Sequence, residues 1–476
     1  MPNCASDEFE YVCLGDKRLK SRLVKLTNHF FESPEMPINQ ACHNWAETKA
    51  AYRFLKNEKV NEIELIEAHS EKTVERAKQY STIIAIQDTC YFNYTNHKKT
   101  EGLGLISVSK EKNNKRFDTN GLIMHTSFAI TTEGLPLGML DQQIIARPTL
   151  SAELKELKKR SHGNAVPIED KESYRWIETL QNSKNRLGNS KIHMITECDR
   201  EADIYDFFLR AYKLETSILV RAKSDRIINK TSRRSRGPQI HLWKHMNSQP
   251  SQGEIAIKIP SRGGKPSRTA LLNLRFDKII FSPPRNHLNY EELCNLKLNV
   301  VYVLEKHPPK GEEPLEWMLL TDIDVNNFEE AEEKVKWYSL RYRIETFHKI
   351  LKSGLKVEDC RLETADRLIR YLTVMSVIAW KIFWITLIGR SNPKLSCTKF
   401  IGEDWKILYA KFYHTMNFPK KPLDAKEAIH LIARLGGFLD RKSDGEPGAI
   451  TMWRGLRRLC DLIEGWNIAT GGDSCG

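Results

Sequence analysis

Two short apolar runs constrain the fold of this chain more than any other feature of its sequence. Ser81–Tyr91 reads Ser-Thr-Ile-Ile-Ala-Ile-Gln-Asp-Thr-Cys-Tyr, and Lys191–Asp203 begins Lys-Ile-His-Met-Ile-Thr-Glu-Cys-Asp. Continuous apolar runs rich in β-branched residues are typical of buried strands. Asp88 and Asp199 lie at or just beyond the ends of these predicted strands. The chain should therefore contain an α/β domain with these two strands in its sheet.

The neighbouring segments extend the same domain. Leu122–Ile130 and Leu135–Leu140 are predicted strands on either side of a Glu-Gly turn, and would form an antiparallel meander with the first run. A polar stretch at about 146–170 is predicted to be a loop or an insertion. The elements that follow are a helix at Lys171–Leu187, a helix at Ile204–Lys213 and a strand at Ser217–Ala222. This order predicts a mixed sheet.

From about residue 225 to 321 the pattern changes to alternating apolar and polar residues, interrupted by Gly and Pro pairs. The predicted strands are Glu254–Ile259, Thr269–Phe276, Lys297–Leu304 and Trp317–Thr321. We interpret this region as a β-rich insertion in the α/β domain. It begins with a basic segment that contains Arg233, Arg234 and Arg236, which is a candidate for phosphate contacts but would equally suit a solvated loop.

Both ends of the chain are predicted to be helical, which divides it into residues 1–75, 76–365 and 366–476. Near the start, Asp16–Phe31 has apolar residues at helical spacing among basic ones, and a second unit contains Arg53. Small helical units with basic faces can bind DNA, although a basic amphipathic helix is at least as often an ordinary surface helix of a soluble protein. The most apolar stretch, Leu368–Ile388, is interrupted by Arg370 and Lys381 and predicts a buried helix rather than a membrane span.

The net charge and the cysteines of the chain indicate its binding partner and its compartment. The net charge of +13 and the isoelectric point of about 9.1 favour an acidic partner, nucleic acid first. The ten cysteines form no CxxC pair, and no segment resembles a signal peptide. We therefore expect a protein of the reducing cytoplasm.

Trp337–Lys352 is predicted to be one helix with an unbalanced stripe of charge. The stripe residues, separated by 3, 4, 4 and 3 positions, are Tyr338, Arg341, Glu345, Lys349 and Lys352. At roughly 100° per residue they share a stripe of about 80°. A single carboxylate among three cations suits a polyanion, whereas a surface helix with i,i+4 ion pairs would explain the same spacing.

Asp88, Asp199 and Glu345 are the candidate catalytic residues. The ends of neighbouring strands in open α/β sheets meet at one edge, so the two Asp residues can converge there. Three converging carboxylates would bind two divalent ions, while Arg and Lys bind neighbouring phosphates. Taken singly, each Asp is more often a turn or cap residue. Together with the helix stripe, they predict metal-dependent phosphoryl transfer on nucleic acid.

The stripe also carries a resemblance to a known family. Tyr338, Arg341, Glu345 and Lys352 match Y-x-x-R-x-x-x-E-x-x-x-x-x-x-K, the signature of DDE transposases of bacterial insertion sequences, in the cut-and-paste group that forms DNA hairpins. The segment from Arg341 is similar to that group's R-W-x-I-E-x-F-H-K, with Tyr342 where the group often has Trp. The similar segments elsewhere are those around Asp88 and Asp199, Ala51–Phe54 and Ala433–Phe438. The resemblance thus spans nearly the full chain.

The resemblance implies a ribonuclease H-like catalytic core that carries the three acids and is interrupted by the β-rich insertion. It implies an N-terminal helical domain that binds the transposon end and a C-terminal helical domain that dimerises the protein. The reaction would use two Mg²⁺ ions per active site, with Mn²⁺ able to substitute, on the inverted-repeat ends of the element and on target DNA. End nicking, hairpin formation, hairpin opening and strand transfer would follow in that order, in the bacterial cytoplasm at the nucleoid and not at a membrane.

The resemblance also implies DNA-contacting residues. Tyr338, Arg341 and Lys352 would hold phosphates near the cut. Trp317 would receive a base flipped from the hairpin, although a core Trp on a strand fits equally well. The other candidate DNA contacts are Lys349, Tyr342, Arg53, Arg221, Lys223, Arg233, Arg234 and Arg236.

Three other interpretations stay open on sequence grounds. One is a nuclease or resolvase of the same core fold that cuts DNA without joining it. Another is a DNA-binding inhibitor without catalysis, against which the presence of all three acids speaks. A basic structural protein would leave the acids unexplained.

Overall fold

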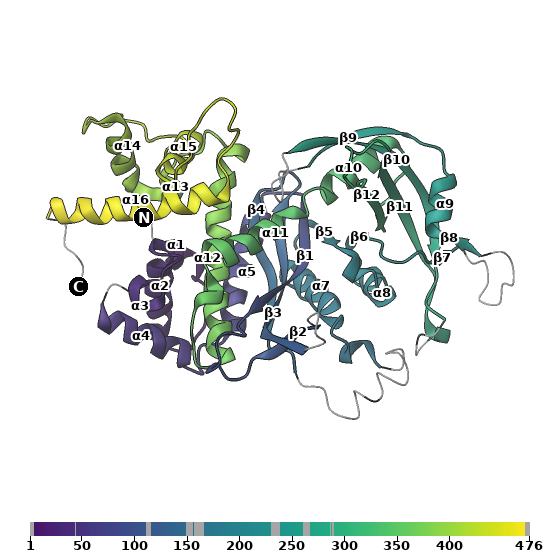
Figure 1. Cartoon of the computed structure of the whole chain (residues 1–476), viewed down its shortest axis with the longest axis horizontal. Coiled ribbons are helices and arrows are strands. Elements are labelled where there is room, and N and C mark those ends of the chain that lie inside the picture. The colour runs from purple at the N-terminus through teal and green to yellow at the C-terminus, as the bar shows by residue number, and fades with distance from the viewer. Residues whose placement is uncertain are drawn as a thin grey trace.

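One large mixed sheet runs through the centre of the protein, with helices on both of its faces and helical regions at both ends of the chain (Figure 1). The computed structural model describes residues 4–42, 44–110, 116–148, 156, 166–229, 239–259, 267–285, 287 and 290–471. Most of the loop predicted at about 146–170 lies outside these residues.

The sheet joins twelve described strands in the order β2-β3-β1-β5-β6-β12-β11-β10-β7-β8, with β4 paired to β3 and β9 to β10. Their bounds are β1 (Thr82–Asn93), β2 (Gly104–Lys110), β3 (Arg116–Thr131), β4 (Pro136–Ile145), β5 (His193–Cys198), β6 (Ser217–Arg221), β7 (Ile227–Ile228), β8 (Ile240–His241), β9 (Gly253–Ile259), β10 (Arg268–Phe281), β11 (Leu296–Glu305) and β12 (Glu316–Thr321).

The strand pairing confirms the predicted mixed sheet. β1 pairs in parallel with β5, and β5 in parallel with β6, whereas β3 pairs antiparallel with both β1 and β4 as the meander required. The sequence interpretation missed β2, which pairs with the outer half of β3. β12 returns antiparallel beside β6, so the β-rich region continues the same sheet.

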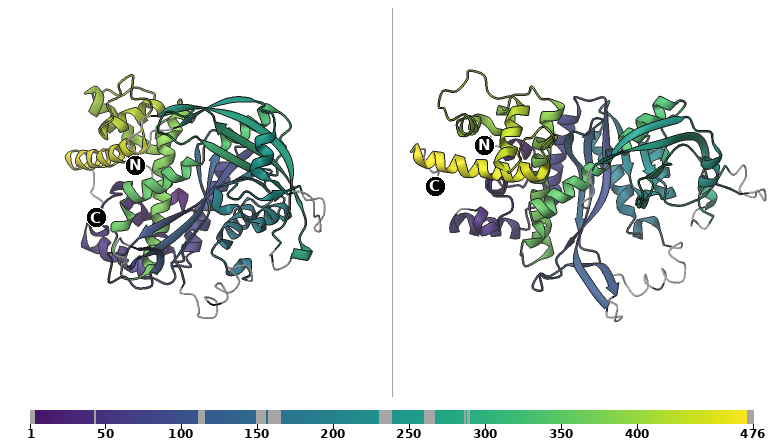
Figure 2. Two further views of the ribbon diagram at one scale, coloured as in Figure 1. Left: turned by 45° about the vertical axis from the view of Figure 1, so that its right-hand side comes forward. Right: turned by 45° about the horizontal axis from the view of Figure 1, so that its top comes forward.

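The α-helices are α1 (Cys4–Glu8), α2 (Lys17–Glu32), α3 (Ile38–Ala41), α4 (Trp45–Lys56), α5 (Glu62–Ala77), α7 (Tyr174–Leu187), α8 (Tyr205–Lys213), α9 (Leu242–Ser248), α10 (Phe328–Tyr338), α11 (Tyr342–Lys349), α12 (Ala365–Ser391), α13 (Thr398–Ile401), α14 (Trp405–Tyr413), α15 (Ala425–Leu435) and α16 (Ala449–Ala469). The first helices and α13–α16 lie together beside α12, at the opposite end of the molecule from β9–β12 (Figures 1 and 2).

Side chains alternate between two apolar cores along the central strands. Ile84 and Ile86 of β1 join the core that contains α11 and α12, whereas Ile83 and Ala85 face the side of α7. A separate core fills the space between α7, α8 and strands β6, β11 and β12. Both faces of β1 are therefore covered, as its unbroken apolar sequence predicts.

The long apolar helix α12 is a core element. It is long and apolar enough to cross a membrane, but 89% of its most apolar window is buried inside the protein. It packs against α2, α4 and α5 on one side and against α15 and α16 on the other. This confirms the predicted buried helix and explains its hydrophobicity by packing.

The prediction of one continuous helix over Trp337–Lys352 is wrong. α10 begins after the cap Asn327 and ends at Tyr338, a turn follows, and α11 gives way to a π-helical turn over Ile350–Gly354. The reason is tertiary, because α10 packs on β9, β10 and β11 whereas α11 packs on β1 and α12. The chain must therefore change direction between them, and the predicted stripe is not one helical face.

Candidate active site

Asp88 in β1 and Asp199 just after β5 come at equivalent positions along two neighbouring parallel strands. The β1–β5 register pairs Ile86 with Glu197, so two residues further along each strand the chain places Asp88 beside Asp199 on the same face. Asp199 directly follows β5 as predicted, and its side chain accepts the backbone N–H of Glu201 at 2.7 Å. The position predicted for Asp88, near the end of its strand, is wrong, because β1 continues to Asn93 and Asp88 lies near its middle.

Glu345 reaches this site from α11, which packs across β1. On the same helix, the Nδ1 atom of His348 lies 3.6 Å from the Oδ2 atom of Asp88. Burial lowers the pKa of His348 to about 3, with the charges of Lys352 and Arg341 acting in the same direction, so His348 is neutral at physiological pH. Glu345 itself is ion-paired with Arg341 and its side chain is 38% exposed, so it can still change partners.

The three acids act on one another electrostatically. Burial raises the pKa of Asp88 to about 7; the charge of Arg341 opposes this shift, and the charges of Asp199 and Glu345 add to it. A carboxyl that is buried near two other carboxylates is stabilised either by a proton or by a metal ion. The structure therefore places the three predicted acids close enough together for the charges of Asp199 and Glu345 to raise the pKa of Asp88.

The donor set suits a hard divalent cation. Carboxylate oxygens are the ligands that Mg²⁺ uses in proteins, and Asp88, Asp199 and Glu345 supply them together with mutual repulsion that a cation would relieve. In the described part of the chain, no group of three or more His, Cys, Asp or Glu side chains is already arranged around one ion position. Glu345 is turned to Arg341 instead, so metal binding would require it to leave this partner.

Tyr338, Arg221 and Trp317 lie together beside the acids, although they come from three elements. Tyr338 is buried at the end of α10, and its ring contacts Trp317 of β12 edge-on, with ring centroids 5.0 Å apart. The guanidinium of Arg221, at the end of β6, donates to the carbonyl of Glu316 at 2.7 Å and also interacts with Tyr338. They lie near Arg341 and Asp199, whose charges act on the Tyr338 hydroxyl.

The two other residues of the predicted stripe, Lys349 and Lys352, come after Glu345 in the chain. Lys349 is exposed at the last turn of α11, and Lys352 follows in the π-helical turn. The Lys352 ammonium donates to the carbonyl of Tyr91 on β1 and lies 5.5 Å from the centre of the Phe92 ring. Lys352 is thereby tied to the strand that carries Asp88.

The remaining predicted DNA contacts are spread over the molecule. Arg53 is exposed on α4, Lys223 is exposed just after β6, and Tyr342 is half-buried at the start of α11. Arg233, Arg234 and Arg236 lie outside the described residues. The structure thus gathers some of the predicted contacts at the acids and leaves others distant.

Sequence reasoning missed one residue of this site, Glu197. It lies in β5 two residues before Asp199, is completely buried, and within the described part of the chain has no hydrogen-bond partner for either side-chain oxygen. Burial raises its pKa well above the ordinary range, and the charge of Arg341 opposes the shift. The available signal was an acid inside an apolar strand, near its end and two residues before a candidate catalytic Asp.

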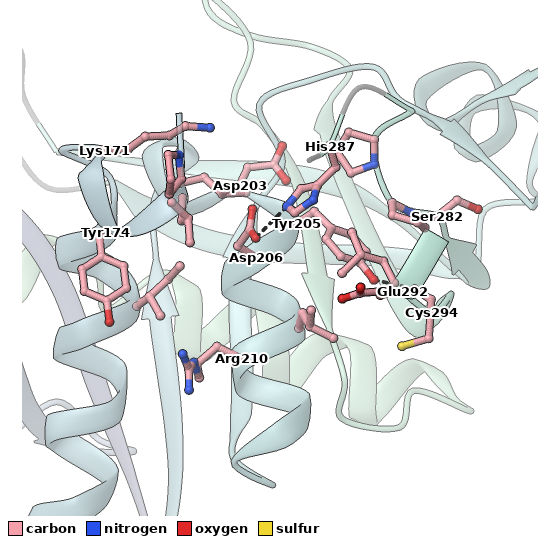
Figure 3. A pocket seen from close by; sticks show the side chains of 18 of the residues that line it. Lys171, Tyr174, Asp203, Tyr205, Asp206, Arg210, Ser282, His287, Glu292 and Cys294 are labelled. Atoms are coloured by element: carbon pink, nitrogen blue, oxygen red, sulfur yellow. Dashed lines mark hydrogen bonds and ion pairs between the residues drawn. The ribbon is translucent and has the colours of Figure 1, made fainter. Parts of the chain in front are cut away.

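A cavity of about 990 Å³ lies on the other side of the sheet, between α7, α8 and the loops that follow β6 and β10 (Figure 3). Asp206 at the start of α8 binds the ring of His287 at 2.9 Å. Asp203 accepts the backbone N–H of Lys223 at 2.7 Å and pairs with Arg226. This cavity belongs to the second apolar core and not to the face that carries the three acids.

Two family models match the chain on either side of the site. Residues 1–60, which include α1–α4, match a model described as Transposase DNA-binding. Residues 377–476, from the second half of α12 to the end of the chain, match a model described as Transposase Tn5 dimerisation domain. The chain is therefore a transposase with an N-terminal DNA-binding region and a C-terminal dimerisation domain.

Through these two regions the chain is similar to transposases of the Tn5 type. The family resemblance predicted from the sequence is thus confirmed, together with DNA binding and a dimerisation domain.

Proposed function

We propose that this protein carries out cut-and-paste transposition with Asp88, Asp199 and Glu345 as its catalytic acids. The observation that carries the proposal is the parallel register that sets Asp88 beside Asp199, under the helix that carries Glu345. A meander of β1, β3 and β4 beside parallel β5 and β6, with helices on both faces, supports a ribonuclease H-like core within residues 76–365. On this proposal residues 1–75 bind the transposon end, and residues 366–476 hold the dimer together.

The acids would hold two Mg²⁺ ions, or Mn²⁺ in their place, which when bound would activate the attacking oxygen and stabilise the leaving oxygen. Tyr338, Arg341 and Lys352 then bind phosphates on either side of the cut and balance the charge that develops there. His348, neutral and next to Asp88, helps to fix the position of that carboxyl. Each of these groups is anchored to β1 or to a helix that packs on the sheet.

The proposed sequence of steps begins with hydrolysis of one strand at the transposon end, which releases a 3′-OH. This hydroxyl attacks the opposite strand to form a hairpin, water reopens the hairpin, and the freed 3′-OH joins target DNA. Trp317 is half-buried against Tyr338, which leaves part of its ring available to a base unstacked by the hairpin. The substrate is bacterial DNA, so the protein would act in the cytoplasm at the nucleoid.

Replacing Glu345 tests this proposal. Glu345→Gln should abolish nicking and hairpin formation while leaving DNA binding nearly unchanged, because metal binding needs the charge whereas affinity for DNA rests on many phosphate contacts. The measurement is incubation with the inverted repeats that flank the gene, in Mg²⁺, followed by denaturing electrophoresis, with binding followed by gel shift.

Glu329→Gln is the matched control, since Glu329 is an exposed acid in the first turn of the preceding helix. It should cut DNA at the wild-type rate. Cleavage by Glu345→Gln at that rate, or a loss of DNA binding in step with the loss of cleavage, would contradict the proposal. A strand-transfer assay with a pre-cut end then separates a transposase from a nuclease, because only the transposase joins a 3′-OH to target DNA.

A further inference from the structure

Glu197 is an unusual residue for the interior of a sheet. It lies in β5 between Ile86 of β1 and Leu219 of β6, is completely buried, and has no hydrogen-bond partner on either oxygen among the residues that the structure describes. Burying a carboxyl group without partners is among the more costly arrangements in a folded protein. The strand positions on either side of Glu197 are aliphatic, and the polar groups whose charges interact with it are Tyr338 and Arg341.

The location of Glu197 relates it to the catalytic acids. Side chains alternate along a strand, so Glu197 shares a face with Asp199, and the register places Ile86, two residues before Asp88, opposite it. Glu197 and Ile86 therefore form the cross-strand pair immediately before Asp88 and Asp199 on the face covered by α10 and α11. The opposite charge that acts on it there is that of Arg341.

Arg341 would lose its ion-pair partner if Glu345 bound a metal ion. In the present structure its guanidinium is paired with Glu345, and its side chain is only 22% exposed. If Glu345 binds a metal ion, Arg341 loses this partner while most of its side chain stays buried. A buried cation without a partner is strongly unfavourable, so the detachment of Glu345 needs a second acceptor for Arg341.

We propose that Glu197 is this second acceptor, a positioning residue that holds Arg341 when Glu345 turns from Arg341 to the metal ions. The inference rests on the proposed function of Glu345 as a metal ligand. It gives the buried carboxyl a role that the fold alone does not need. A DNA phosphate would also accept Arg341, so the contribution of Glu197 is largest before DNA is bound.

The decisive measurement is Mn²⁺ binding to the DNA-free protein by calorimetric titration at fixed pH, together with the midpoint of thermal unfolding. Glu197→Gln should weaken Mn²⁺ binding 10- to 100-fold, the range typical for residues that support metal ligands. Its unfolding midpoint should rise, because the substitution removes a buried acid without a partner. Glu197→Met, of similar volume and apolar, should behave in the same way.

Thr196→Val is the matched control. Thr196 precedes Glu197 on the opposite face of β5, is fully buried, and likewise has no partner for its side-chain oxygen among the described residues. It should leave Mn²⁺ affinity unchanged. In an Arg341→Gln background, adding Glu197→Gln should cause no further loss of Mn²⁺ affinity, because the proposed effect passes through Arg341.

Unchanged Mn²⁺ affinity in Glu197→Gln and Glu197→Met would overturn the inference, as would a loss that persists in the Arg341→Gln background. A fall in the unfolding midpoint of both variants would also overturn it and identify Glu197 as a structural residue. Failure of the proposed function gives a different result, since Glu345→Gln would then bind Mn²⁺ as tightly as the wild type.

Discussion

At the scale of single residues, Asp88 combines burial with two like charges. Its pKa is raised to about 7 by burial first, and then by Asp199 and Glu345 against the opposing charge of Arg341. Because the pKa in the folded state exceeds the ordinary value of 3.8, the contribution of Asp88 to stability is largest below that value. This contribution is lost as the pH rises toward and through about 7, so the metal-free site becomes a source of instability when it ionises.

The same shift predicts a pH-dependent metal affinity. A metal ion must displace the proton of Asp88 below pH 7, so Mn²⁺ affinity should fall by up to about tenfold for each unit of pH below this value and level off above it. Calorimetric titrations at pH 6, 7 and 8 in buffers of different ionisation enthalpy would measure both the affinity and the proton released. An affinity that stays constant from pH 6 to pH 8 would contradict this prediction.

At the scale of elements, the C-terminal helices α15 and α16 are in direct backbone contact. A Cβ atom added at Gly455 of α16 would lie 1.8 Å from the carbonyl oxygen of Ile432, and one at Gly436 would lie 1.9 Å from that of Thr451. These approaches leave no room for a side chain. The pairing of the two helices therefore depends on glycine at both positions.

Gly455→Ala should consequently destabilise the C-terminal domain, by about 1–3 kcal/mol or more if the helices cannot separate slightly. Gly465→Ala is the matched control, because Gly465 lies on the same helix with open space around its Cβ position. That substitution should be neutral or stabilising by up to about 1 kcal/mol, since Ala favours a helix over Gly. Thermal unfolding together with sedimentation velocity would test both, and equal effects of the two variants would refute the close-contact argument.

At the scale of the whole molecule, one buried network joins both ends of the chain to the sheet. Arg76 of α5 bonds both carboxylate oxygens of Glu8 at 3.0 Å, and His69 lies 2.6 Å from the same carboxylate. The Arg76 guanidinium also donates to the carbonyl of Leu137 at 2.6 Å and stacks 4.1 Å from the ring centre of Trp380 in α12. The DNA-binding region, the sheet and the C-terminal helical region thus share one polar junction.

Breaking this junction should be costly. Glu8→Gln leaves Arg76 without its buried counter-charge, for which about 3–5 kcal/mol of lost unfolding free energy is expected. Glu10→Gln is a suitable control, because Glu10 pairs with Lys72 from an exposed position and should contribute little. Urea unfolding at neutral pH measures both variants, and a loss for Glu8→Gln no greater than that for Glu10→Gln would contradict the prediction.

The pH dependence of the same group gives an independent test. Burial alone would raise the pKa of Glu8, but the charges and hydrogen bonds of Arg76 and His69 bring it down to about 2. The folded-state pKa is thus depressed, so the stabilisation is complete above the ordinary value of 4.5 and is lost as the pH falls from about 4.5 to about 2. Across this window the wild type should lose about 3 kcal/mol more than Glu8→Gln. Parallel losses in the two proteins would argue against it.

The sequence by itself determined the elements whose signals are local. The apolar run of β1, the amphipathic spacing of α2 and the length of α12 identify these elements, because burial on one or both faces must be encoded along the segment itself. Asp88 and Asp199 could be singled out for the same reason, since an Asp within or next to an apolar run stands out locally.

Only the tertiary structure decided how these elements meet. It ended α10 at Tyr338, because α10 and α11 pack on different parts of the sheet. It set the register that places Asp88 beside Asp199, paired Arg341 with Glu345, and buried Glu197 behind them. Strand register and helix direction depend on contacts between residues more than a hundred positions apart, and local periodicity carries no information about such contacts.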